Sequence, residues 1–280
     1  MIDNSIMKTI YYYQTFVGLH KLLPHLTDID VINVSSIHFD TDINGSKNIY
    51  LNDNLPTAPK FDQMWMEVQK AYAEGVTIML MVGGAGGAYT NLFNDFETYY
   101  PMLRELLQQK TFISGIDIDI EEFVKLSDVQ KFINQLKQDF PDIKLSMAPV
   151  APSMMGNYPG MGNFSYKDLY RTEEGQCIDW FNVQCYDSFS FDTYNKIINN
   201  GYPPEKINMG MESGQFDKTN FKVAISEVKK CIETYPKMGG VFDREYLNAP
   251  PVVNDPSHWC FLMKNVDQEF FDSCGAIILE

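Results

Sequence analysis

The sequence has few basic residues for its size. It carries 22 Lys and Arg against 37 Asp and Glu over 280 residues, a formal net charge of −15. Nucleic acids and anionic membrane surfaces attract basic patches, so this balance argues against both as partners. No stretch comes near the roughly 18 consecutive apolar residues of a membrane span. The acidity disfavours these partners without indicating any particular substrate.

Signals for export and for cross-linking are also missing. The first 18 residues lack the basic-then-apolar order and the small-residue cleavage site of a secretory signal. We therefore expect the mature chain to start near Met1, unless a signal was removed beforehand. The five cysteines are odd in number and no two are spaced as CxxC, so neither a disulfide framework nor a zinc site is predicted. Reduced thiols favour an intracellular location.

Linkers, internal repeats and low-complexity tracts are absent as well. Hydrophobic residues make up 45% of the chain and aromatic residues 14%, which is typical of a globular protein. We predict a single domain over residues 1–280, a length that suits an α/β barrel of about 250 residues.

The sequence does contain a repeated order of short apolar runs and longer amphipathic ones. Eight short runs have the composition of parallel strands covered on both faces: Lys8–Tyr13, Val31–Phe39, Val76–Val82, Phe112–Ile120, Ile143–Met147, Ile178–Tyr186, Ile207–Met211 and Gly240–Asp243. Helical patterns follow most of them: Gln63–Ala73, Pro101–Gln109, Asp128–Phe140, Phe191–Asn199, Lys218–Thr234 and Ser257–Phe271, with a short turn at Ser165–Tyr170.

This order predicts the α/β class and a (β/α)8 TIM barrel. The runner-up, an open doubly wound sheet, would need a glycine-rich phosphate loop, and Gly83–Gly87 has neither the GxGxxG nor the GK[ST] spacing. We expect these glycines to let the backbone turn tightly beside an active site. Asn44-Gly45 predicts a hairpin after the second strand that forms one wall of that site. Further signals are Pro101 in a first helical turn and a Ser127–Gln130 capping box.

The segment Ser114–Glu121, SGIDIDIE, is the most informative one. Acidic and apolar residues alternate with the period of a strand, so Asp117, Asp119 and Glu121 share one face. In a barrel, these carboxylates would face the interior and climb about 6–7 Å per two residues toward the mouth, where Glu121 comes last. Because like charges repel, at least one should hold a proton near neutral pH, which suits a general acid.

Three other interpretations of this segment stay open or fail. A half-exposed antiparallel strand would simply turn its acidic face to water. A divalent metal on three barrel carboxylates remains possible. An EF-hand calcium loop fails, because that pattern needs Gly at its sixth position and no alternating Ile.

The segment resembles the DGxDxDxE signature of glycoside hydrolase family 18, the chitinases and endo-β-N-acetylglucosaminidases. Four further segments resemble motifs of that family in the order its (β/α)8 barrel requires, and together they span about residues 8–245. They are Met81–Gly84 for SxGG, Met147–Pro149 for the fifth-strand ending, Gln184–Asp187 for the QxYN or MxYD motif, and Gly239–Phe242 for GGVM.

The resemblance implies a retaining, substrate-assisted mechanism on β-1,4-linked N-acetylglucosamine glycans, in which the acetamido oxygen of the substrate is the nucleophile. Glu121 would be the acid/base, and Asp119 would orient the acetamido group with Asp117 as its inner partner. Tyr186 would hold the acetamido oxygen. Gln184 and Asp187 match substrate-contacting positions. This scheme needs no metal or organic cofactor, and its partner is an oligosaccharide or polysaccharide; the sequence does not indicate the oligomeric state.

The sequence departs from the family pattern at three positions. Ser114 replaces the first Asp of the signature, Met81 replaces the Ser of SxGG, and Arg244 stands where a Trp floors the sugar subsite. An Arg plane can stack on a sugar but also favours a charged or differently shaped ligand. We expect Arg244 and Glu212 at the rim as substrate-binding residues, and His38 there as a structural residue or a substrate contact.

Two other functions remain as alternatives. A catalytically weak, lectin-like protein that binds glycans is favoured by the missing subsite Trp, whereas the retained Asp117, Asp119, Glu121 and Tyr186 favour an enzyme. A metal-dependent barrel enzyme would reveal itself by sensitivity to EDTA. The loop Ser153–Phe164 is either a sugar-binding lid or a variable surface loop, and the apolar tail Cys274–Leu279 is expected to pack on the barrel.

Overall fold

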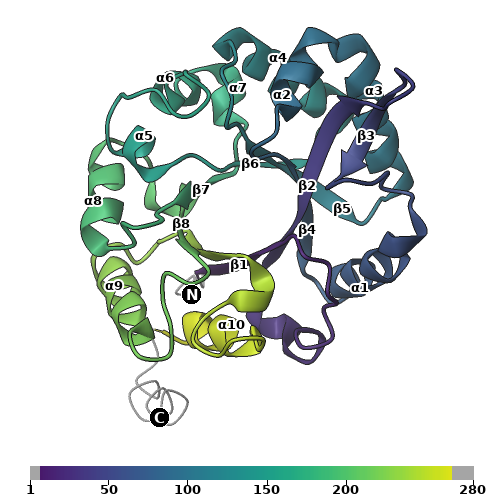
Figure 1. The fold of residues 1–280 in the computed structure, drawn as a ribbon. Coiled ribbons are helices and arrows are strands. Elements are labelled where there is room, and N and C mark those ends of the chain that lie inside the picture. Colours follow the sequence, from purple (N-terminus) through teal and green to yellow (C-terminus); the bar gives the residue numbers. More distant parts are fainter. Residues whose placement is uncertain (1–6, 267–280) are drawn as a thin grey trace.

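Eight parallel strands form a closed barrel in the computed structural model, which describes residues 7–266 (Figure 1). The first strand pairs with both the second and the last, in parallel, which closes the sheet and excludes the open doubly wound alternative. The barrel strands in pairing order are β1 (Lys8–Tyr13), β2 (Val31–Thr41), β4 (Thr77–Gly83), β5 (Ile113–Asp119), β6 (Lys144–Met147), β7 (Trp180–Gln184), β8 (Ile207–Glu212) and β9 (Gly240–Arg244).

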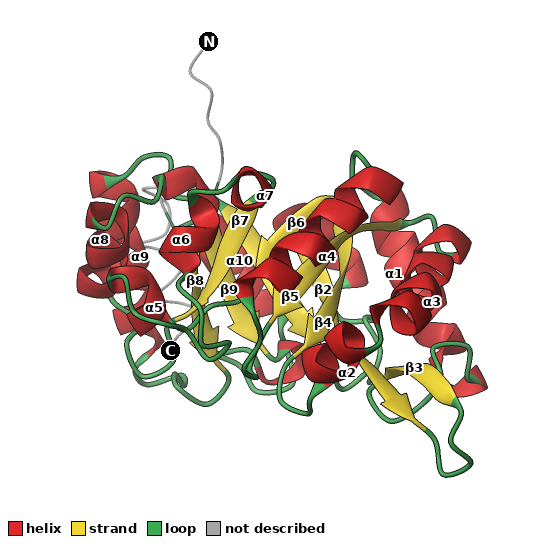
Figure 2. Cartoon of the chain, turned by 90° about the horizontal axis from the view of Figure 1, so that it is seen from above, coloured by secondary structure: helices red, strands yellow, loops and turns green. Residues whose placement is uncertain are grey.

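Helices surround the barrel on its outside (Figures 1 and 2). The described helices are α1 (Asp62–Ala73), α2 (Ala88–Asn94), α3 (Phe96–Gln109), α4 (Leu126–Asp139), α5 (Ala151–Met155), α6 (Tyr166–Tyr170), α7 (Glu173–Gln176), α8 (Phe191–Asn199), α9 (Phe221–Thr234) and α10 (Ser257–Lys264), with 3-10 turns η1 (Leu23–Asp28), η2 (Pro59–Phe61), η3 (Pro204–Lys206) and η4 (Tyr246–Asn248). This arrangement confirms the predicted (β/α)8 barrel.

The predicted hairpin is confirmed. Strand β3 (Lys47–Leu51) pairs antiparallel with the end of β2, and Thr41 pairs with Lys47 across a turn that contains Gly45 at φ +83°. Figure 2 shows this hairpin projecting past the carboxyl ends of the barrel strands. It therefore stands beside the edge at which active sites of such barrels lie.

Three predicted helix starts are wrong by two or more residues. Helix α9 begins at Phe221 rather than at Lys218. Helix α3 begins at Phe96, so Pro101 lies inside it rather than in its first turn. Helix α4 begins at Leu126, its N-cap is Lys125, and no side chain caps it. Gln130 instead donates a hydrogen bond of 2.9 Å to Glu174 in α7, so a tertiary contact takes the place of the Ser127–Gln130 capping box. The predicted end of the last helix at Phe271 and the packing of Cys274–Leu279 lie outside the described residues.

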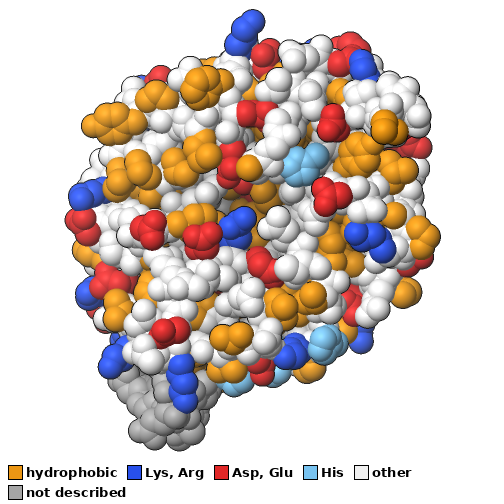
Figure 3. Space-filling model, viewed as in Figure 1, with side chains coloured by type: hydrophobic (Ala, Val, Ile, Leu, Met, Phe, Trp, Pro, Cys, Tyr) orange, Lys and Arg blue, Asp and Glu red, His pale blue; other side chains and the backbone are white. Residues whose placement is uncertain are grey.

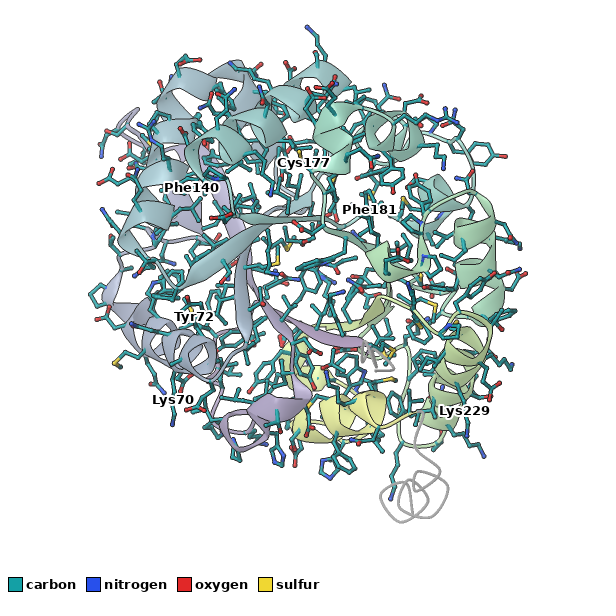
Figure 4. The ribbon with its side chains drawn as sticks, turned by 180° about the vertical axis from the view of Figure 1, so that it is seen from behind. Lys70, Tyr72, Phe140, Cys177, Phe181 and Lys229 are labelled. Carbon is teal, nitrogen blue, oxygen red and sulfur yellow. The ribbon has the colours of Figure 1, made fainter. Side chains whose placement is uncertain are left out.

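The main hydrophobic core lies between the strands and the helices. Ile116, Ile118 and Ile120 of the β5 segment belong to it, each at most 2% exposed. Figure 4, from the opposite end, shows Phe181 in the same layer, between β7 and the helices. Every second residue of a strand faces the other way. The acids that alternate with the isoleucines therefore point into the barrel, which overturns the interpretation as a half-exposed antiparallel strand.

The four cysteines within the described residues are free thiols, as the composition predicts: Cys177, Cys185, Cys231 and Cys260. Cys274 lies outside the described residues. No helix among residues 7–266 is long and apolar enough to cross a membrane.

Candidate active site

Strand β5 carries its acids into a cavity of about 900 Å³ at the carboxyl end of the barrel. This volume is at the upper end of the 300–1,000 Å³ typical of ligand sites. Asp117 is fully buried, and Asp119 is 5% exposed. Glu121 comes two residues after the strand ends and is half-buried in the cavity wall. The acids therefore climb from the closed interior toward the mouth, as the alternation predicts.

Asp117 is held by three side-chain donors from three other strands. The Tyr12 hydroxyl donates to its Oδ2 over 2.8 Å, the Ser146 hydroxyl to its Oδ1 over 2.5 Å, and the Asn182 amide to the same Oδ1 over 3.0 Å. These donors hold the pKa of Asp117 down, although burial raises it overall. Sequence reasoning missed all three residues as part of the site.

The carboxylates perturb one another in the predicted direction. Burial and then the charges of Glu121 and Asp117 raise the pKa of Asp119 well above its usual value. Burial also raises the pKa of Glu121, while the charge of Arg244 and a hydrogen bond from Gln184 counteract the rise. A half-buried Glu with a raised pKa at a cavity wall retains a transferable proton at higher pH than an exposed one.

Strand β7 brings two further predicted residues to the acids. The Gln184 amide donates to Asp119 Oδ1 over 3.3 Å and to the backbone oxygen of Ala148 over 2.8 Å. Tyr186 follows the end of the strand, lines the cavity and packs edge-on to Phe242. Burial raises the pKa of its phenol well above the usual value, so the hydroxyl remains a donor. Gln184 and Tyr186 both line the cavity, although Tyr186 lies in the turn after the strand rather than on the strand itself.

Arg244 ends β9 and lines the cavity. Its Nη1 lies 3.1 Å from Oε1 of Glu212, which ends β8 beside it. Both side chains are about half exposed. Glu212 thus reaches the site through Arg244 and is not among the residues that line the cavity. Asp187 is exposed, has φ +61°, and is also not among the lining residues.

The hairpin and the strand before it form the other wall of the cavity, as predicted. His38, Asp40, Tyr50, Asn52 and Asp53 line this wall. His38 Nε2 lies 2.7 Å from the Ser36 hydroxyl, and burial lowers the pKa of the imidazole. Figure 3 views this end of the molecule and shows acidic side chains around its middle, with few basic ones.

The glycine segment Gly83–Gly87, which begins at the last residue of β4, lets the ends of β4 and β5 approach each other. Gly83 has φ +105°, and a Cβ on it would lie 2.1 Å from the backbone oxygen of Asp119. The next amide, of Gly84, donates to that same oxygen over 2.9 Å. Beyond the segment, Glu122 accepts a hydrogen bond of 2.5 Å from the Tyr89 amide at the start of α2. The predicted tight turn beside the site is confirmed.

The loop Ser153–Phe164 contributes nothing to the cavity lining. Tyr158 is 68% exposed, whereas Phe164 is buried and packs on Tyr166. Within residues 7–266, no group of three His, Cys, Asp or Glu side chains is placed to hold a metal ion. The site is therefore a polar and aromatic cavity organised around one ladder of carboxylates.

The site thus combines a carboxylate ladder on β5 with a tyrosine after β7 at the mouth of a closed parallel barrel. Residues 8–248 match the family model of glycosyl hydrolases family 18. The chain belongs to this family. No curated protein matched it.

Solved structures resemble this chain over most of its length. A fungal endo-β-N-acetylglucosaminidase of glycosyl hydrolase family 18 is 27% identical, with a TM-score of 0.82, over 92% of this chain and 97% of that one. The chitinase ChiC of Aspergillus fumigatus is also 27% identical, with a TM-score of 0.79, over 92% and 98%. A family 18 chitinase from Pseudoalteromonas aurantia, 21% identical with a TM-score of 0.67 over 92% and 99%, shares the fold.

Proposed function

We propose that this protein is a retaining, substrate-assisted glycoside hydrolase that cleaves β-1,4 bonds of N-acetylglucosamine-containing glycans. The observation that carries the proposal is the ladder of Asp117, Asp119 and Glu121 inside one cavity with Tyr186. Membership of glycosyl hydrolase family 18 supports it, because this family is an exception to the retaining scheme with two carboxylates.

Glu121 is the proposed acid/base. It protonates the glycosidic oxygen as the bond to the anomeric carbon breaks, and the acetamido oxygen of the same sugar attacks that carbon to form an oxazolinium ion. The Glu121 carboxylate then takes a proton from a water molecule that opens the ring of this intermediate. The protein itself forms no covalent bond to the sugar. The acetamido oxygen and then the water attack the anomeric carbon from opposite faces, so the configuration is inverted twice and is therefore retained.

Asp119 and Tyr186 act on the acetamido group in this proposal. Asp119 accepts the acetamido N–H and balances the positive charge of the oxazolinium ion. The Tyr186 phenol donates to the acetamido oxygen and aims it at the anomeric carbon. Gln184 keeps Asp119 in place through its 3.3 Å hydrogen bond, and Arg244, Glu212 and Asp187 are proposed as substrate-binding residues at the rim. The scheme requires no metal or organic cofactor.

Two substrate classes fit the proposal equally. The fungal relative is named an endo-β-N-acetylglucosaminidase and the Aspergillus fumigatus relative a chitinase, and both are 27% identical to this chain. Chitin oligosaccharides and a high-mannose N-glycopeptide are therefore the two substrates to compare. Cleavage of one and not the other assigns the class.

The test is product release from both substrates by the wild type and by Glu121→Gln. We expect the wild type to cleave at least one substrate, and Glu121→Gln to bind that substrate but not turn it over, because only the proton is lost. Glu105→Gln is the matched control, since it makes the same chemical change on the exposed face of α3. Near-full activity of Glu121→Gln would remove Glu121 from the acid role.

A second candidate function is glycan binding without turnover. Arg244, in place of the subsite Trp that the family pattern requires, is the observation that favours it. Glycan binding by the wild type together with silence on both substrates would establish this function instead.

A further inference from the structure

The strands on either side of β5 place unlike residues beside Asp117. In the parallel register, Asp117 pairs with Met81 on β4 and with Ser146 on β6. Asp117 and Ser146 are fully buried, and Met81 is 8% exposed. One neighbour is therefore apolar and offers no hydrogen bond, whereas the other offers a hydroxyl. Met81 is also the position at which the sequence departs from the SxGG pattern of its family.

Met81 fills its side of the site with an apolar group. Its Cε and Asp119 Oδ2 both lie within 4 Å of the point where a Cβ on Gly84 would stand. Met81 also belongs to the small apolar cluster inside the barrel, together with Tyr12 and Phe242. No side-chain donor reaches Asp117 from β4, whose residue in register is this methionine.

The Ser146 hydroxyl lies 2.5 Å from Asp117 Oδ1, the shortest of the three contacts to this carboxylate. The second donor to Oδ1, the Asn182 amide, is itself oriented by Asn208, whose amide donates to Asn182 Oδ1 over 2.8 Å. Tyr12 serves the other oxygen from β1. A buried carboxylate retains its charge only where hydrogen bonds replace the lost water.

We propose that Ser146 is a positioning residue that keeps Asp117 anionic, and that it supplies from β6 the hydroxyl that β4 lacks at Met81. The inference rests on the proposed function. It names a residue that affects the protonation of Asp117 and, through it, of Asp119. Burial and the charges of Glu121 and Asp117 raise the pKa of Asp119, the carboxyl nearer the sugar, so the charge of Asp117 tunes how Asp119 gains and loses its proton. Ser146 touches no reacting atom and acts through Asp117.

Other charged and titratable groups around Asp117 do not replace this hydroxyl. Tyr12 faces it from β1 and Asp119 and Glu121 follow it on its own strand, while Arg244 at the end of β9 acts on Asp119 and Glu121. Burial raises the pKa values of the Tyr89 and Tyr166 phenols, and the charges of Asp119 and Asp117 raise them further; neither phenol donates to Asp117. Removing Ser146 therefore leaves Oδ1 with one donor.

The experiment compares Ser146→Ala, Met81→Ser and the double variant with the wild type. We expect Ser146→Ala to lower kcat about tenfold with little change in KM, the size of effect expected for a lost hydrogen bond to a charged group. The acidic limb of the kcat profile should move to higher pH, because Asp117 then takes up its proton more readily. Ser146→Thr keeps the hydroxyl and should keep the profile.

The double variant tests whether a hydroxyl from β4 can replace the Ser146 hydroxyl from β6. Met81→Ser places a hydroxyl beside Asp117 from β4, so it should restore most of the kcat and the acidic limb that Ser146→Ala loses. Ser153→Ala is the matched control: its hydroxyl is also buried but donates to the backbone oxygen of Val150 over 2.7 Å. It should change stability without moving the pH profile.

A second readout does not depend on activity. The carboxyl ¹³C signal of Asp117, identified by its absence in Asp117→Asn, should titrate at higher pH in Ser146→Ala than in the wild type. An unmoved titration in a folded Ser146→Ala protein overturns the positioning role, whatever the activity. If the folded double variant recovers neither the kcat nor the titration pH of Asp117, a hydroxyl at position 81 does not replace that of Ser146. If the wild type cleaves no glycan, the proposed function fails, and this titration still decides the role of Ser146.

Discussion

At the scale of the residue, Tyr186 is the simplest test of the proposed mechanism. Its phenol lies at the cavity wall with a pKa that burial holds well above the usual value, so it is a preorganised donor. Tyr186→Phe should lower kcat by roughly 10- to 1000-fold, the range expected for one such donor. Steady-state kinetics on the cleaved substrate measure this, and Tyr158→Phe, on the exposed loop outside the cavity lining, is the control. An unchanged rate would remove Tyr186 from the site.

Arg244 belongs to the same scale, because its single charge acts on the proposed acid. Burial raises the pKa of Glu121, and the neighbouring Arg244 guanidinium partly counteracts this rise by stabilising the carboxylate. Arg244→Gln should therefore raise that pKa, and the basic limb of the kcat profile, where Glu121 loses its proton, should move to higher pH. Arg244→Lys keeps the charge and should leave the limb near its wild-type position. A basic limb that moves to lower pH in Arg244→Gln would contradict this assignment.

Single residues also show what the sequence could and could not predict about the site. Asp117, Asp119 and Glu121 were predictable because they alternate with isoleucines on one strand. Tyr12, Ser146 and Asn182 were not, because each is the only polar group that its strand sends to Asp117. They meet at one carboxylate because of the register between strands. The sequence pattern of a single strand gives no information about that register.

At the scale of the element, the turn after β4 depends on Gly83. A Cβ there would meet the Asp119 backbone oxygen at 2.1 Å and the Tyr89 ring at 2.5 Å, and the positive φ adds strain. Gly83→Ala should lower the free energy of unfolding by more than the roughly 1–2 kcal/mol of a left-handed residue alone, and should lower activity by displacing Asp119. Urea denaturation and kinetics measure both effects.

The hairpin turn provides the matched control for Gly83. Gly45 also has a positive φ, but a Cβ on it would meet nothing within 4 Å. Gly45→Ala should therefore show the backbone cost alone and leave activity close to that of the wild type. Equal losses of stability in the two variants would mean that the contact between the ends of β4 and β5 does not explain Gly83.

The boundaries of helices were predictable where a local sequence signal sets them. Their prediction failed where tertiary contacts determine where the helix begins. The predicted helix over residues 191–199 is confirmed residue for residue in α8, which begins after Ser190, whose hydroxyl accepts the Thr193 amide. Helix α2 was not predicted, because glycines precede it and the Tyr89 amide in its first turn donates to Glu122, far away in sequence. The starts of α3 and α4 failed for the related reason that packing extends both helices beyond their local signals.

At the scale of the whole molecule, closure of the sheet brings several acids out of water at once. The barrel was predictable from eight alternating runs, but the burial of individual acids was not. Asp243 is an example: it is fully buried on β9, its Oδ2 accepts the Ser213 hydroxyl over 3.1 Å, and its Oδ1 has no partner. Burial raises its pKa well above the usual value, and the charges of Glu245 and Glu212 raise it further. With a net charge of −15, the molecule already repels itself at neutral pH.

This burial predicts how stability depends on pH. The pKa values of Asp117, Asp119, Glu121 and Asp243 are higher in the folded chain than in the unfolded one, so above about pH 4 the folded form binds more protons. The free energy of unfolding should therefore fall as the pH rises through the folded pKa values, and mild acidification from pH 8 should stabilise the protein.

Asp243→Asn removes one of these charges and keeps the shape of the side chain. It should raise the free energy of unfolding at pH 8 by about 1–3 kcal/mol, which corresponds to roughly one or two units of pKa. The reason is that folding no longer requires this carboxyl to take up a proton or to bury its charge, so the pH dependence should also flatten. Urea denaturation at several pH values measures both, with the exposed Asp142→Asn as control. A pH dependence as steep in Asp243→Asn as in the wild type would mean that folding does not raise the pKa of Asp243.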